Sequence, residues 1–72
     1  MAKNSISSSI RLLRFHNNEM TQQELADKVG VTRQTIASIE KGKYSPSLEL
    51  AFKIAGVFDK PLDEIFTYNK QI

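Results

Sequence analysis

The sequence predicts an all-α fold, a compact bundle of five helices, with a short terminal strand left open. Three observations support this prediction. Helix-capping residues recur along the chain, Gly30 and Gly42 stand where helices are expected to end, and apolar residues repeat with the three- and four-residue spacing of helix faces. Alternation of apolar and polar residues, which is typical of half-buried strands, is absent from most of the chain. We expect residues 1–72 to form a single small domain.

The first helix is expected at about residues 8–17, where the serines at positions 7 to 9 supply an N-cap. Helical spacing then places four residues on the face that would pack inward: Ile6, Ile10, Leu13 and Arg14. Leu12 and Phe15 fall off this face. Either they pack inward as well, or they form an exposed apolar patch that binds a protein partner.

The second helix is expected at about residues 21–29, where the run "TQQE" matches a capping box. In this motif the Thr21 hydroxyl accepts a hydrogen bond from the Glu24 amide, and the Glu24 carboxylate reaches back to the amide of the cap. Gly30 ends the helix, because glycine adopts a positive φ without steric cost. The apolar face of this helix consists of Leu25, Ala26 and Val29.

The third helix is expected at about residues 32–41, capped by Thr32 and stopped by Gly42. Only about three residues, "GVT", join it to the second helix, so the two helices must cross steeply rather than lie antiparallel. Ala26, four residues before Gly30, is small enough for the two backbones to approach each other at this corner. Together these features match a helix-turn-helix motif.

The fourth helix follows "YSPS", with Ser45 as its cap and Pro46 at its first position, and ends at about Phe58. It is apolar on more than one side, which predicts a central buried helix. Its apolar residues are Leu48, Leu50, Ala51, Ile54, Ala55 and Phe58. The run "DKPLDEIF" predicts a short fifth helix with Leu62, Ile65 and Phe66 facing inward. The tail "TYNKQI" is either a short strand or frayed.

The outer face of the third helix is polar. With Ile36 turned toward the core, about 100° per residue places Ile39 and Glu40 on the same inner side. The opposite side and its flank carry Arg33, Gln34, Ala37, Ser38 and Lys41. Arginine pairs with guanine, glutamine with adenine and serine with either, while alanine can touch a thymine methyl group. A merely solvated face is the alternative, but such faces usually mix glutamate with lysine, and this one contains no acid.

Charge and composition narrow the class of function. Residues 28–43 carry four cations against one acid, a net charge of +3 in a chain whose net charge is +2. This uneven distribution favours a face that binds a polyanion. The chain has no cysteine and one histidine, His16, so we expect no metal site. The sequence shows no nucleophile–base pair and no glycine-rich phosphate loop, so we expect no enzyme activity and no cofactor. No apolar run approaches the roughly 20 residues that cross a bilayer, so we expect a cytoplasmic protein.

The run "TQQELADKVGVTRQTIASIEKGKYSPSLELAFKIAGVF" resembles the Cro/C1-type (Xre-like) helix-turn-helix family of bacterial and phage transcriptional repressors. The resemblance covers roughly residues 10–66 and is greatest to the short, single-domain members. It implies a lambda-repressor-like DNA-binding domain in which the third helix is the recognition helix. It also implies a homodimer that binds a two-fold symmetric operator.

The resemblance assigns roles by position. The places that contact DNA bases are held by Arg33, Gln34, Ala37 and Ser38. The places that contact DNA phosphates are held by Gln22, Thr32, Thr35, Lys41, Lys43 and Tyr44. A partly buried ion pair that ties the first helix to the third is expected between Arg14 and Glu40. The dimer interface is expected at Leu62, Ile65, Phe66 and Tyr68.

One departure from the family pattern lies in the first loop. Six residues, "FHNNEM", separate Arg14 from Thr21, where the pattern usually has five. Two alternatives to a repressor also stay open. The chain would serve as an antitoxin that represses its own promoter and also binds a toxin, for which an exposed Leu12 and Phe15 would be suited. Alternatively it would be a helical adaptor that binds protein, against which the basic face argues.

Overall fold

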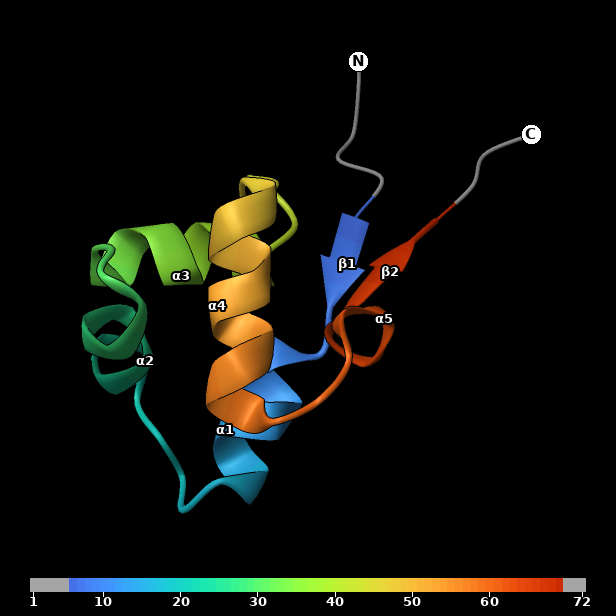
Figure 1. The fold of residues 1–72 in the computed structure, drawn as a ribbon. Coiled ribbons are helices and arrows are strands. Elements are labelled where there is room, and N and C mark those ends of the chain that lie inside the picture. The colour runs from blue at the N-terminus through green and yellow to red at the C-terminus, as the bar shows by residue number, and fades with distance from the viewer. Residues whose placement is uncertain (1–5, 70–72) are drawn as a thin grey trace.

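The computed structural model describes residues 6–69 and contains five helices and a two-stranded sheet (Figure 1). The elements in chain order are β1 (Ile6–Ser8), α1 (Ile10–His16), α2 (Gln22–Val29), α3 (Arg33–Glu40), α4 (Leu48–Phe58), α5 (Leu62–Ile65) and β2 (Phe66–Tyr68). The predicted bundle of five helices is therefore confirmed. The two-stranded sheet adds a feature that the helical pattern did not contain.

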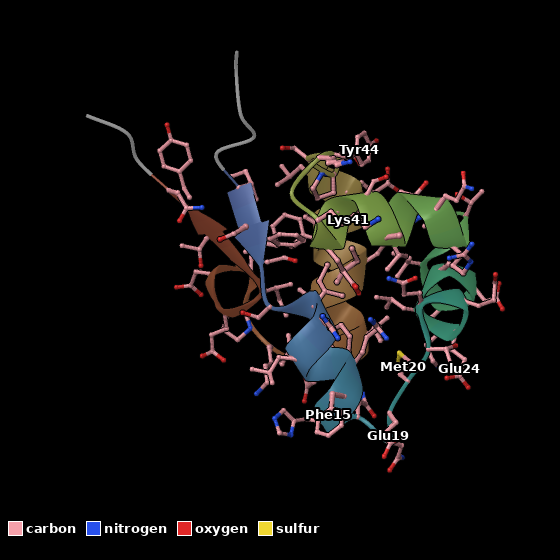
Figure 2. The ribbon with its side chains drawn as sticks, turned by 180° about the vertical axis from the view of Figure 1, so that it is seen from behind. Phe15, Glu19, Met20, Glu24, Lys41 and Tyr44 are labelled. Atoms are coloured by element: carbon pink, nitrogen blue, oxygen red, sulfur yellow. The ribbon has the colours of Figure 1, made fainter. Side chains whose placement is uncertain are left out.

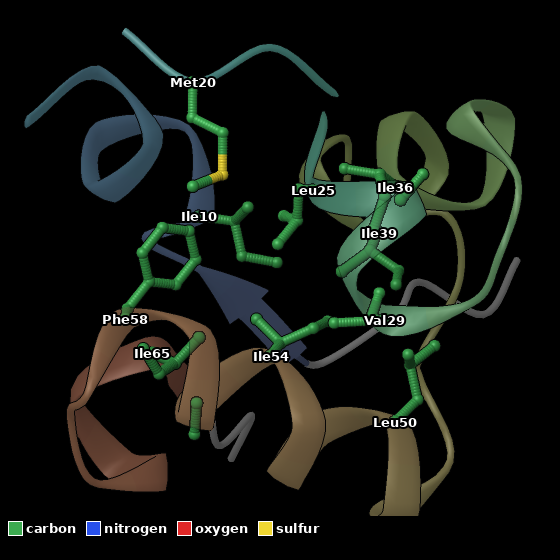
Figure 3. Packing of buried hydrophobic residues seen from close by; sticks show 12 residues of the cluster. Ile10, Met20, Leu25, Val29, Ile36, Ile39, Leu50, Ile54, Phe58 and Ile65 are labelled. Atoms are coloured by element: carbon green, nitrogen blue, oxygen red, sulfur yellow. The ribbon is translucent and has the colours of Figure 1, made fainter. Parts of the chain in front are cut away.

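Helix α4 runs through the middle of the molecule, with α2 and α3 on one side and α5 with the sheet on the other (Figure 1). Side chains from all five helices and from the first loop meet beside it and form one apolar core (Figure 3). The largest fully buried side chains are Ile10, Leu25, Ile36, Ile54 and Ile65. Isoleucines and a leucine at helical spacing on each element thus converge on one core, as the apolar stripes predict.

The start of α4 differs from the expectation. Ser47, not Ser45, caps the helix, because the Ser47 Oγ accepts the hydrogen bond of the Leu50 amide at 3.1 Å. Pro46 consequently lies before the helix. Leu48 is 68% exposed, so its placement among the buried residues was wrong. The first turn of α4 directs Leu48 outward, and burial of this helix begins at Leu50.

The N-terminal segment also differs from the expectation. Ile6 is not on a helix but in β1, where it pairs with Tyr68 of the antiparallel strand β2. Ser9 precedes α1 without a side-chain capping bond, and its amide instead donates to the Ile65 carbonyl at 2.8 Å. The strand alternative for the tail is confirmed for residues 67 and 68, and residues 70–72 lie outside the described residues. Phe66, expected in the fifth helix, is instead the first residue of β2.

Leu12 and Phe15 are 58% and 62% exposed, so the alternative in which they pack inward was wrong. The loop after α1 absorbs its additional residue through Asn18 and Glu19, which both adopt left-handed φ angles, 57° and 53°. Met20 then turns into the core, where it is 8% exposed (Figure 3). The last residue of the longer loop, Met20, thus packs into the core, while Leu12 and Phe15 stay exposed on α1.

Candidate nucleic-acid interface

A capped helix and a left-handed glycine build the corner between α2 and α3. The Thr21 hydroxyl accepts the Glu24 amide at 3.0 Å, and the Thr21 amide donates to the Glu24 carboxylate at 2.8 Å. Both bonds of the predicted capping box are therefore present. Gly30 closes the helix at φ 77°, and its amide donates to the Ala26 carbonyl at 2.8 Å. Ala26 is fully buried at this corner, as the close approach of the two helices requires.

Helix α3 is held firmly at both ends and along one side. The Thr32 hydroxyl accepts the Thr35 amide at 3.2 Å, which caps the helix start. Gly42 adopts φ 75° just after the helix ends. Ile36 and Ile39, 0% and 2% exposed, anchor the inner side in the core. These contacts fix the direction in which the polar side of α3 points.

The side of α3 that faces away from the core brings together the residues predicted to contact bases. Arg33 and Gln34 are exposed, and Ala37 and Ser38 are partly exposed. A shallow groove on the same side joins residues from both predicted contact sets and is lined by Thr32, Gln34, Thr35, Ser38 and Tyr44. Lys41 and Tyr44 lie at the end of this surface (Figure 2). We call it the α3 face.

The α3 face keeps its positive charge available to a ligand. Within residues 6–69, the ion pairs join Arg14 to Glu40, Lys53 to Glu49 and Lys60 to Glu64. The exposed cations of the α3 face, Arg33 and Lys41, and the adjacent Lys43 belong to none of these pairs. A polyanion that docks here can therefore pair with them without first displacing an acid of the domain.

The expected ion pair between α1 and α3 is present. The Arg14 guanidinium donates to the Glu40 carboxylate twice, from Nε at 2.7 Å and from Nη2 at 3.0 Å. Its Nη1 donates to the Met20 carbonyl at 2.8 Å. The two side chains are only 14% and 8% exposed. This bidentate, largely desolvated geometry is the strong form of a charged hydrogen bond.

Gln22 also belongs to this cluster, which the sequence reasoning missed. Its Nε2 donates to the Glu40 Oε1 at 3.0 Å. Gln22 is the first residue of α2, and Glu40 is the last residue of α3. The two lie 18 positions apart, so no local pattern in the sequence connects them.

The residues predicted for a dimer interface divide into two groups. Tyr68 is 67% exposed, and Leu62 and Phe66 are partly buried against the core. Ile65 is 1% exposed and belongs to the core of this structure, so its side chain offers almost no surface to a partner. The sequence reasoning did not identify Phe52 as an exposed apolar residue near this surface, although it is 57% exposed and lines a groove with Leu62.

A tight corner of two helices, with the second helix anchored on one side and presenting a basic, polar side outward, defines a helix-turn-helix DNA-binding domain. The chain belongs to the Cro/C1-type helix-turn-helix family of transcriptional regulators, because the helix-turn-helix family model matches residues 10–65. This range begins with the first residue of α1 and ends with the last residue of α5. The family therefore covers the entire helical part of the structure.

Comparisons with individual proteins agree with this membership. The chain is 60% identical over 55 residues to an uncharacterized HTH-type transcriptional regulator of Methanocaldococcus jannaschii, covering 76% of this chain and 80% of that one. It is 39% identical over 59 residues to the cryptic phage CTXphi transcriptional repressor RstR of Vibrio cholerae, covering 82% of this chain and 52% of the repressor. A crystal structure from Bacteroides fragilis shares the fold, with a TM-score of 0.73 at 21% identity, covering 86% of this chain and 98% of that one.

The part of the chain that the structure describes contains neither a membrane-spanning helix nor a metal site. Among residues 6–69, no helix has both the length and the apolar character needed to cross a membrane. Within the same range, no three histidine or acidic side chains are grouped so that they could hold a metal ion.

Proposed function

We propose that this regulator is a sequence-specific repressor that inserts α3 into the DNA major groove. The observation that supports the proposal most directly is the composition of the α3 face. A guanidinium, an amide and a hydroxyl stand there beside a small alanine, on a helix anchored by two buried isoleucines. These groups are the donors and acceptors that read base edges, and the small residues allow a helix to lie deep in the groove.

The phosphate contacts would surround this base-reading set. Apart from Gln22, the phosphate set lies in the first turn of α3 or close to its two ends: Thr32, Thr35, Lys41, Lys43 and Tyr44. Gln22 stands at the N-terminus of α2, where the helix dipole favours an anion. Backbone contacts of this kind fix the register of a protein on the duplex, while the base contacts provide specificity. Repression would follow from occlusion of a promoter, and the likeness to RstR, itself named a repressor, supports that direction of control.

We further propose that the active form is a homodimer on a two-fold symmetric operator. The interface would use Leu62, Phe66 and Tyr68, on the side of α4 away from α2 (Figure 1). The short sheet there leaves one edge of each strand for pairing with a second copy. A dimer of this kind would space its two α3 helices about 34 Å apart, one turn of DNA. The dimer would act in the cytoplasm, associated with the nucleoid when bound to DNA, without enzyme activity.

Selection of duplexes from a random pool tests this proposal. We expect the bound pool to converge on two inverted half-sites whose centres lie about 10 base pairs apart. Recovery of single, asymmetric sites would contradict the dimer but keep the base-reading role of α3. A pool that stays random after repeated selection would contradict sequence-specific binding altogether.

One observation favours a second activity. Leu12 and Phe15 form an exposed apolar patch on α1, and Figure 2 shows Phe15 at the opposite end of the view from Lys41 and Tyr44. A protein bound there would leave the α3 face accessible to DNA, which suits an antitoxin that represses its own promoter. Parallel pull-downs with the wild type and with Leu12→Glu test this activity. A partner retained by the wild type and lost by the variant supports it, provided that the variant still binds DNA.

A further inference from the structure

Four hydrogen bonds link three helices around the Glu40 carboxylate. Glu40 accepts Arg14 Nε and Nη2 at 2.7 and 3.0 Å, and Gln22 Nε2 at 3.0 Å. Arg14 Nη1 donates to the carbonyl of Met20, the residue immediately before the cap of α2. One guanidinium thus holds the backbone that leads into α2, while its carboxylate partner holds the first side chain of that helix.

The chemistry of Glu40 determines how the Gln22 amide is turned. An ionised carboxylate only accepts hydrogen bonds, so the amide must present its nitrogen to Glu40 rather than its oxygen. The amide nitrogen carries two hydrogens, and Glu40 accepts one of them. The second hydrogen stays available to a ligand, and Gln22 is partly exposed at the N-terminus of α2.

We infer that the Arg14–Glu40 pair is a positioning device for Gln22, which turns the free amide hydrogen toward a DNA phosphate. The inference rests on the proposed function, because it assigns the pair a role in DNA binding beyond its role in the fold. A glutamine with three free torsions loses rotamer freedom when it binds. Here the bond to Glu40 imposes that loss during folding, so that the phosphate contact forms with less entropic cost.

The test separates positioning from stability by replacing the ion pair with an apolar pair. Arg14→Met combined with Glu40→Leu keeps the volume of the cluster, and such replacements of buried ion pairs are often neutral for stability. They remove the acceptor that orients Gln22. The probe is the duplex that the wild type selects from a random pool, measured by fluorescence anisotropy at a temperature where each variant is folded.

We expect Gln22→Ala and the apolar-pair variant to weaken DNA binding through loss of the same phosphate contact. Gln22→Ala and the apolar pair should each weaken binding about tenfold, in the range of one hydrogen bond to a charged group. Combined, they should still weaken it about tenfold rather than a hundredfold, because the pair acts through Gln22. Gln23→Ala is the matched control, since the neighbouring Gln23 is exposed and bonds only Asp27 of its own helix, at 2.9 Å. Its binding should equal that of the wild type.

Ethylation interference adds a readout that a purely structural role would not move. Gln22→Ala and the apolar pair should both lose interference at one and the same phosphate in each half-site. Full affinity in the apolar-pair variant, or a hundredfold loss in the combined variant, would overturn the inference. A wild type that selects no duplex would instead contradict the proposed function.

A measurement on the wild type covers the case in which the apolar pair does not fold. In the free protein, the Gln22 side-chain amide hydrogen that is bonded to Glu40 should exchange with solvent more slowly, as measured by NMR, than the side-chain amide hydrogens of the exposed Gln34. Both Gln22 signals should persist, with one shifted, when the duplex is added. If both Gln22 side-chain amide hydrogens exchange with solvent as fast as those of Gln34 in the free protein, the inference is overturned.

Discussion

Loss of one partner from the Arg14–Glu40 pair should destabilise the domain far more than loss of a surface pair. Glu40→Ala removes three hydrogen bonds to the carboxylate, two from Arg14 and one from Gln22, and leaves the guanidinium, 14% exposed, beside an apolar methyl group. Removal of one member of a buried pair costs about 3–5 kcal/mol. Arg14 keeps some contact with solvent and its bond to Met20, so we expect the lower end, about 3 kcal/mol.

The assay is urea denaturation followed by circular dichroism, with a thermal scan beside it. For a domain of this size, about 3 kcal/mol corresponds to a midpoint lowered by about 12–24 °C. A chain of 72 residues is stabilised by about 4–11 kcal/mol, so the variant should remain measurably folded. The slope of the free energy with urea should not change, because the surface exposed on unfolding stays nearly the same.

Glu49→Ala is the matched control. It breaks the Glu49–Lys53 pair, a contact of 3.5 Å within α4 whose partners are 81% and 54% exposed. Exposed pairs one helical turn apart contribute about 0.3–0.5 kcal/mol, so the unfolding midpoint should hardly move. If Glu40→Ala also costs less than about 1 kcal/mol, the Arg14–Glu40 pair behaves like a solvated pair and our reasoning from burial is refuted.

Three further predictions concern DNA, backbone and assembly. Gln34→Ala should make the free energy of binding to the selected duplex less favourable by about 1–3 kcal/mol and relax the sequence preference at one base position. Lys43→Ala should instead weaken binding to all duplexes alike and reduce the slope of affinity with salt by about one. Anisotropy titrations at several salt concentrations distinguish the two effects. Gly42→Ala should destabilise the fold by about 1 kcal/mol, since Gly42 has φ 75°, whereas Gly56→Ala, in the last turn of α4 with open space around it, should stabilise it by about 0.5–1 kcal/mol. Changes of the same sign in urea denaturation would contradict this account. Tyr68→Asp should raise the concentration at which dimers form in sedimentation equilibrium, because it places a charge on the proposed interface; an unchanged dimer would exclude Tyr68 from it.

The helical elements followed from the sequence because their determinants are local. The capping box spans Thr21 to Glu24, and Thr32 caps an amide three residues away. The glycine stops act through the φ angles of Gly30 and Gly42 alone. Contacts of three or four residues do not depend on the rest of the chain, so the boundaries of α2 and α3 and the corner between them were predictable.

The candidate site was predictable in part. The outward side of α3 follows from helical periodicity once Ile36 is assigned to the core. The bond from Gln22 to Glu40 was not predictable, because it depends on how closely the start of α2 approaches the end of α3. The exposure of Phe52 likewise depends on which elements cover α4, and periodicity alone treated α4 as apolar on several sides.

The sequence by itself determined which segments are helical, where the helix-turn-helix corner lies and which side of α3 is polar. Capping and helical periodicity act over a few residues, and in α2 and α3 no distant contact overrode them. Only the tertiary structure decided that residues 6–8 form a strand, since their partners lie at residues 66–68. It also decided that Leu12 and Phe15 face outward and that Gln22 is bonded to the ion pair. Each of these outcomes depends on contacts between elements far apart in the chain, which a local pattern does not contain.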